Sequence, residues 1–190
     1  MALSPETVAA LADEYPDEQP LATVEDEHRE LLPATLAEGS YGWRDVEWIV
    51  QWYFRRFLGR YPDAERRAAE ERFGDNEYED LETAIGGALA AETTHAKLEA
   101  LTALEGVDVP IGTAFLQFLE PERYLAMSAR EWAVLREHGE LEEPYPEAPD
   151  AEDYERYLEW CRTIADRCNC ELWDCYRALW LLGHRSENGE

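Results

Sequence analysis

The feature that most constrains the fold is a short turn between two apolar stretches in the middle of the chain. Apolar residues recur with a helical period of about 3.6 residues before the turn and again from Ile111 onward, and Gly106-Val107-Asp108-Val109-Pro110 separates them. Glycine adopts conformations that a Cβ opposes, and proline suits the first turn of a helix. We predict helix, turn, helix, short loop and helix between residues 98 and 135. Such a hairpin would present helix-start N–H groups to a phosphate.

The rest of the chain has the same periodicity, which predicts an all-α fold. It contains no alternating strand pattern of useful length and no internal repeat. Pro16 and Pro20 should break the chain after a first helix, residues 139–150 should form a proline-rich surface loop, and residues 186–190 should fray. The expected helices cover 4–15, 24–38, 43–58, 62–72, 76–91, 93–104, 111–119, 128–138, 151–168 and 171–183.

These helices predict one domain over residues 1–190. An N-terminal helical extension would cover 1–42, a core with the hairpin at 105–110 would cover 43–138, and a C-terminal helix pair would cover 150–184. Within the core, helices of 43–91 should form one lobe and those of 93–138 another. The hairpin would then lie at the cleft between the two lobes.

The charge of the chain is strongly unbalanced. Acidic residues number 43 against 17 basic ones, the formal charge is −26, and Lys97 is the only lysine. A dense carboxylate surface keeps a protein hydrated in concentrated salt, and the pattern resembles haloarchaeal proteins, so we expect a protein that works in high potassium or sodium salt. No stretch approaches the roughly 20 uncharged residues of a membrane span, and the acidic N-terminal segment is no signal peptide. We expect a cytoplasmic protein with no membrane partner.

A family resemblance is carried by residues in and after the turn. These are Leu104, Gly106, Val107 and the apolar run after Pro110, continued by Pro121, Tyr124 and Arg130. The segment resembles the helix-hairpin-helix of the DNA glycosylase superfamily, which contains endonuclease III-like and 8-oxoguanine-type enzymes. The resemblance covers about 40 residues closely and residues 43–183 in helix order. It implies a two-lobed all-α fold whose hairpin holds the DNA backbone, often with a monovalent cation, and whose catalysis uses an aspartate and, in some members, a lysine.

The chain departs from the family pattern at each position that carries chemistry. Asp108 replaces the second hairpin glycine, Pro110 stands at the lysine position and Ser128 stands at the aspartate position. A serine lacks the negative charge that stabilises an oxocarbenium-like sugar, and Asp108 places a carboxylate where a phosphate would approach. The resemblance therefore implies the fold more strongly than the activity.

Two interpretations of Glu131 remain open. Ser128 can cap the helix at 128–138, and Glu131, three residues later, would complete a capping box. Alternatively, Glu131 or Asp108 is the displaced carboxylate of a glycosylase or lyase. We favour the structural interpretation.

Arginines are concentrated between residues 55 and 72, the only locally basic region. They could hold a nucleic-acid backbone beside Tyr53, Phe54 and Tyr61, or pair with carboxylates of neighbouring helices, which we favour. The predicted nucleic-acid contacts are Gly106, Val107, Asp108, Val109, Arg55, Arg56 and Arg60.

Four cysteines have the spacing C-x6-C-x-C-x4-C, and they are Cys161, Cys168, Cys170 and Cys175. This spacing is similar to the C-x6-C-x2-C-x5-C that binds a four-iron cluster in endonuclease III-like enzymes. Each of the last two gaps between cysteines is one residue shorter here. The surroundings are also helical rather than a loop. Buried free thiols are the favoured interpretation, and we expect no metal and no cofactor.

Three functions remain open. The first is a non-catalytic relative of the glycosylases that binds duplex DNA, and the second, nearly equal, is a structural or protein-interaction module that has kept the helix packing. The third, well behind, is a glycosylase or lyase with a displaced carboxylate, so an enzyme is not the favoured expectation. The acidic surface should repel phosphates, although at molar salt the Debye length of ~3 Å erases long-range repulsion.

Overall fold

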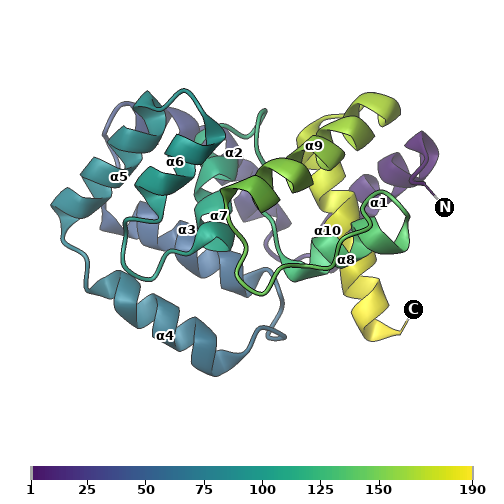
Figure 1. The fold of residues 1–190 in the computed structure, drawn as a ribbon, viewed down its shortest axis with the longest axis horizontal. Helices are drawn as coiled ribbons and strands as arrows, with labels where there is room; N and C mark the ends of the chain where they lie inside the picture. Colours follow the sequence, from purple (N-terminus) through teal and green to yellow (C-terminus); the bar gives the residue numbers. More distant parts are fainter. Residues whose placement is uncertain (1, 190) are drawn as a thin grey trace.

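The computed structural model describes residues 2–189, which form ten α-helices and no β-strand (Figure 1). The predicted all-α class is confirmed. Between these residues, no helix is long and apolar enough to cross a lipid bilayer. The helices are α1 (Pro5–Glu18), α2 (Ala22–Ala37), α3 (Trp43–Arg55), α4 (Asp63–Gly74), α5 (Tyr78–Ala90), α6 (Thr94–Leu101), α7 (Val109–Leu119), α8 (Ala129–Glu137), α9 (Ala151–Cys168) and α10 (Leu172–Asn188).

Helix α7 lies at the centre of the molecule. Every residue from Pro110 to Leu119 is buried, and the helix packs against α2, α3, α6 and α9. A helix that is apolar on all sides is stable only where other elements cover it. The apolar run after the turn is therefore the core helix around which the others are arranged.

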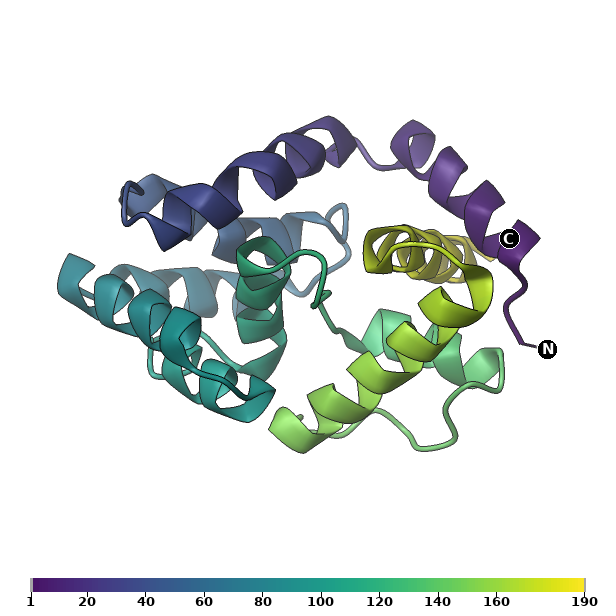
Figure 2. The same cartoon turned by 90° about the horizontal axis from the view of Figure 1, so that it is seen from above.

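The other helices form two groups beside α7 (Figures 1 and 2). In one group α5 packs against α6 and α2, and in the other α1, α8 and α9 pack against α10. This grouping differs from the expected lobes of 43–91 and 93–138, because α6 joins α5 and α8 joins α10. Figure 2 shows α1 and α2 running end to end along one face, so the N-terminal segment contributes to both groups.

The predicted break at Pro16 is wrong. Helix α1 continues through Pro16 to Glu18, and Gln19, which precedes Pro20, is extended. A proline removes only one intrahelical hydrogen bond. Pro16 lies close to the end of α1 and follows the fully buried Tyr15, whose packing keeps this part of the helix in place. A proline favours an extended conformation for the residue before it. Gln19, before Pro20, adopts that conformation, whereas Tyr15, before Pro16, stays helical, so the helix ends before Pro20.

The predicted fraying of residues 186–188 is also wrong. Helix α10 extends to Asn188 and ends at Gly189, whose φ is 79°. Glu187 on this last turn forms an ion pair with Arg130 of α8. This contact with another helix therefore keeps residues 186–188 helical although their sequence is polar. Glu190, also predicted to fray, lies outside the described residues.

The connection from α7 to α8 passes through the core as irregular chain. Residues 124–127 are each at most 1% exposed. Side chains of α7 accept hydrogen bonds from its backbone: Gln117 Oε1 lies 2.5 Å from the nitrogen of Ala126, and Thr113 Oγ1 lies 2.9 Å from that of Met127. Buried N–H groups without acceptors are costly, so these two side chains stabilise the crossing.

The carbonyl groups of the same connection are satisfied by tyrosines. Tyr154 and Tyr157 of α9 donate to the carbonyls of Leu125 and Ala126 at 2.9 and 3.2 Å. Tyr53 of α3 donates to the carbonyl of Met127 at 3.3 Å. Because three helices hold the connection in place, the start of α8 has a defined position.

We expect Thr113→Val to lower the free energy of unfolding by about 1–3 kcal/mol, because the buried N–H of Met127 would lose its acceptor. Urea unfolding in molar potassium chloride measures the change. The control is Thr163→Val, whose exposed hydroxyl donates only to the carbonyl of Glu159 on its own helix. It should change stability by less than about 0.5 kcal/mol. Equal effects of the two substitutions would contradict the assigned role of Thr113.

Candidate functional site

The hairpin packs directly against helix α4. Gly106 has a φ of 77°, and a Cβ built on it would lie 2.4 Å from the carbonyl oxygen of Ala69 and 2.6 Å from the nitrogen of Phe73. The amide of Asn76 bonds both the N–H and the carbonyl of Glu105, at 2.9 and 3.0 Å. Only glycine allows this approach, so Gly106 is explained by packing on α4 rather than by a phosphate.

The start of α7 carries its own anion. Asp108 is the N-cap of α7, and its carboxylate accepts a hydrogen bond from the N–H of Ile111 at 3.0 Å. Val107 is buried, whereas Val109 is half-buried. A carboxylate in this position fills the place that a phosphate would take at a helix N-terminus.

A cleft of about 430 Å³ lies where the α3–α4 connection, the start of α7, the start of α8 and the loop 139–150 meet. It brings Asp108 and Pro110 of the hairpin next to Ser128 at the start of α8. The glycosylase resemblance places its lysine and aspartate positions at Pro110 and Ser128, and both line this cleft. Its lining residues are Tyr53, Phe57, Arg60, Tyr61, Pro62, Glu65, Asp108, Pro110, Ser128, Ala129, Arg130, Tyr145, Glu147, Pro149 and Glu187.

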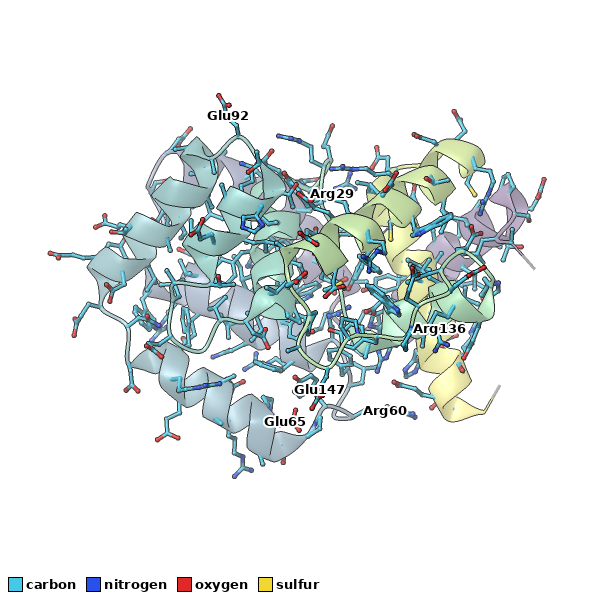
Figure 3. The ribbon with its side chains drawn as sticks, viewed as in Figure 1. Arg29, Arg60, Glu65, Glu92, Arg136 and Glu147 are labelled. Atoms are coloured by element: carbon cyan, nitrogen blue, oxygen red, sulfur yellow. The ribbon has the colours of Figure 1, made fainter. Side chains whose placement is uncertain are left out.

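Carboxylates and aromatic rings share this lining. Glu65, Asp108 and Glu147, here called the carboxylate set, are exposed and form no ion pair with any side chain of residues 2–189. Figure 3 shows Glu65 and Glu147 near each other beside the start of α4, with Arg60 close by. Burial raises the pKa of Tyr145 and of Tyr61, and the negative charge of Asp108 raises both further. The rings and the carboxylates therefore act on one another across the cleft.

The predicted arginine contacts are largely engaged by the protein itself. Arg60 lies 3.8 Å from the carboxylate of Glu187, and Arg66 and Arg67 pair with Asp63 on their own helix. The favoured interpretation, pairing with carboxylates of neighbouring helices, holds for Arg60 and Glu187, whereas Arg66 and Arg67 pair within α4. Arg55 is exposed at the end of α3, and in the part of the chain that the structure describes it has no ion pair.

Arg56 is completely buried in an ion pair with Glu131. Its Nη1 and Nη2 donate to the two carboxylate oxygens at 2.9 and 3.2 Å, and both side chains are 0% exposed. Four rings surround the guanidinium with centroids 4.8–5.9 Å from its carbon, and they belong to Trp52, Tyr53, Phe57 and Tyr176. Burial disfavours both charges, but each charge stabilises the other, so the pKa of Arg56 is raised and that of Glu131 is lowered. Arg56 is therefore not available to a nucleic acid.

The capping interpretation of Ser128 is confirmed, and that of Glu131 is wrong. Ser128 Oγ accepts a hydrogen bond from the N–H of Arg130 at 3.2 Å, as an N-cap does. Glu131 forms no capping box, because its carboxylate binds Arg56 and the hydroxyl of Ser128 instead. This buried carboxylate cannot reach a substrate in the cleft, which argues against its use as a displaced catalytic group.

The four cysteines do not form a metal centre in the described chain. Cys161, Cys168 and Cys175 are buried and Cys170 is half-buried, and all four are free thiols. No group of three or more His, Cys, Asp or Glu side chains between residues 2 and 189 is arranged to hold a metal ion. Burial raises the pKa of Cys170 to about 12, so its thiol is a weak nucleophile at neutral pH.

A second buried carboxylate, Glu25 of α2, forms no ion pair with any side chain that the structure describes. It accepts hydrogen bonds from the hydroxyl of Tyr15 at 2.6 Å and from the indole N–H of Trp52 at 2.7 Å. Burial raises its pKa, although both hydrogen bonds and the charges of Arg177 and Arg56 act in the opposite direction. Glu25 thus joins α1 to α3, and its burial disfavours the ionised carboxylate.

No protein-family model, curated protein or solved structure was found to match this chain. The resemblance to the DNA glycosylases therefore rests on the residues of the turn and of the helices after it. What the cleft can do must be argued from its own side chains.

Sequence patterns missed two residues of the cleft and one buried carboxylate outside it. Tyr145 belongs to the proline-rich loop, Glu187 to the segment predicted to fray, and Glu25 to an acidic helix. Glu187 and Glu25 have no local signal, because each acquires its role from residues on other helices. The aromatic side chain within an otherwise polar loop was the one available indication for Tyr145.

Removing one partner of the Arg56–Glu131 pair should be strongly destabilising. We expect Arg56→Met and Glu131→Gln each to lower the free energy of unfolding by about 3–5 kcal/mol. The first substitution leaves the carboxylate of Glu131 buried without a cation, and the second leaves the guanidinium of Arg56 buried without an anion. The double variant should lose less than the sum, as a urea double-mutant cycle would show. Arg67→Met, which removes an exposed pair with Asp63, should cost at most about 1 kcal/mol. Strictly additive losses at the buried pair would contradict the coupling.

Glu25 should make stability fall as pH rises. Because its folded pKa is raised above the unfolded value of about 4.3, the folded state binds the proton more tightly, and this contribution is lost as pH increases through the folded pKa. Free energies of unfolding of wild type and Glu25→Gln, measured from about pH 4 to 8, should therefore diverge, with the wild type declining relative to the variant. Parallel curves would show that the carboxylate is ionised without penalty.

Proposed function

We propose that the protein is a non-catalytic interaction module whose cleft binds a basic segment of a protein partner. The observation that supports this most directly is the carboxylate set beside the rings of Tyr61 and Tyr145. A Lys or Arg side chain would gain both a carboxylate and the face of an aromatic ring there.

The electrostatics of the chain favour a cationic partner over a nucleic acid. At molar salt, charges act only over a Debye length of ~3 Å, so the lining of the cleft decides what binds, rather than the total charge of −26. Glu65, Asp108 and Glu147 form no ion pair within residues 2–189, whereas the two arginines of the cleft, Arg60 and Arg130, already contact Glu187. A phosphate backbone would meet free carboxylates and engaged arginines.

Duplex DNA is the second candidate. It is favoured by one observation, the meeting of the hairpin and the start of α8 in the same cleft, as the glycosylase resemblance implies. An enzymatic role has weaker support, because Glu131 is buried against Arg56 and Asp108 is used as the cap of α7.

The test is fluorescence anisotropy with a labelled peptide of arginine, lysine and glycine in ~2–3 M potassium chloride, where only close contacts remain unscreened. We expect saturable binding that weakens about fivefold or more in the double variant Glu65→Gln/Glu147→Gln, since each lost close pair contributes up to ~1 kcal/mol. Glu92→Gln/Glu99→Gln removes the same charge from exposed positions outside the cleft, and Figure 3 shows Glu92 on the opposite side from Glu65. This control should bind like the wild type.

A labelled duplex oligonucleotide is titrated in parallel under the same conditions. Binding of the duplex but not of the peptide would overturn the proposal in favour of DNA. Equal peptide binding by the cleft variant and its control would also overturn it, because the carboxylate set would then play no part.

A further inference from the structure

Arg130 occupies a place built for a buried guanidinium. Its stem crosses α10 at Gly183, where a Cβ would lie 2.4 Å from Arg130 Cγ. Its guanidinium carbon lies 4.5 Å from the ring centroid of Phe57 and 5.7 Å from that of Trp180. The side chain is only 3% exposed, yet it contributes to the lining of the cleft.

A single carboxylate satisfies part of this group. Arg130 Nε and Nη2 donate to the two oxygens of Glu187 at 3.0 and 2.7 Å, while the buried Nη1 has no partner within residues 2–189. Arg60 donates from Nη1 to the main-chain carbonyl of Glu187 at 3.0 Å, and its guanidinium lies 3.8 Å from the carboxylate. Glu187 is 37% exposed and sits on the last turn of α10.

Two arginines lie close to Glu187 in an otherwise acidic protein. Burial lowers the pKa of His184, one turn earlier on α10, and the positive charges of Arg130 and Arg60 lower it further. Two arginines thus share one carboxylate. This exceeds what a single exposed ion pair requires.

We propose that Arg60 and Arg130 form an oxyanion-binding site that adjoins the cleft and that Glu187 fills as an internal ligand. A carboxylate or phosphate of an incoming ligand would take the two hydrogen bonds that Arg130 donates to Glu187 and would lie beside the guanidinium of Arg60. Arginine suits such planar, two-point recognition of an oxyanion. Arg130 and Arg60 hold Glu187 on the last turn of α10, so an oxyanion that takes over these contacts would release it at the cost of that turn alone. The site uses residues other than the carboxylate set and does not depend on the proposed peptide binding.

The test uses Glu187→Gln in the full chain, with inorganic phosphate as the probe and potassium chloride at matched ionic strength. Calorimetric titration should show saturable phosphate binding at least tenfold tighter than in the wild type. The thermal midpoint, lowered by the substitution, should rise with phosphate. Adding Arg130→Gln should abolish both effects. Acetate in place of phosphate shows whether a simple carboxylate also binds.

Two further variants complete the test. Glu14→Gln removes a carboxylate from Arg185, another arginine of α10, and should show no phosphate dependence. Glu187→Asp keeps the charge with a shorter reach and should bind phosphate with intermediate affinity, even if Glu187→Gln folds poorly. The proposal is overturned if folded Glu187→Gln or Glu187→Asp binds neither anion more tightly than the wild type. It is equally overturned if Glu14→Gln binds phosphate as tightly as Glu187→Gln.

Discussion

The buried ion pair between Arg56 and Glu131 is the interaction on which the rest of the structure depends. It joins the end of α3, which packs on the central helix α7, to α8. The main-chain carbonyl of Arg56 also accepts hydrogen bonds from the indole of Trp180 at 2.9 Å and the amide of Gln19 at 3.3 Å. Because removing either charge would leave the other uncompensated in the interior, the pair fixes the two helices that carry it against each other. The hydroxyl of Ser128 donates to the same carboxylate, which ties the wall of the cleft to this pair.

The arginines of this protein serve mainly to hold acidic helices together. Arg167 pairs with Glu140, Arg177 with Asp26, and Arg185 with Glu14 and Glu18. Arginine is suited to this role, because its planar guanidinium forms several hydrogen bonds at once and is more weakly hydrated than an ammonium group. The single lysine is used in the same way, since Lys97 is buried and contacts Glu120 and the carbonyl of Ala88. A run of arginines in so acidic a chain therefore indicates ion pairs within the protein more than a surface that binds nucleic acid.

The cleft combines two kinds of recognition within a small volume. Unpaired carboxylates beside tyrosine rings suit a cation, and Arg60 with Arg130 suits an oxyanion once Glu187 leaves. Side chains of three helices hold the connection before α8, so this wall of the cleft has a fixed position. A rigid frame with exposed polar groups at its centre is the usual arrangement of a binding site.

The sequence by itself determined the helices, most of their ends and the turn at Gly106, because periodicity, caps and prolines act over a few neighbouring residues. Ser128 caps α8 at the position that its local sequence predicts, whereas the capping of α7 by Asp108 came from the structure. The tertiary structure alone decided which side chains meet. Arg56 and Glu131 are 75 residues apart, and Arg130 and Glu187 are 57 residues apart. No local pattern distinguishes a buried arginine from an exposed one, because its burial depends on a carboxylate supplied by another helix. For the same reason, the local sequence at Glu187 predicted a frayed end, while its contact with Arg130 made it part of the cleft.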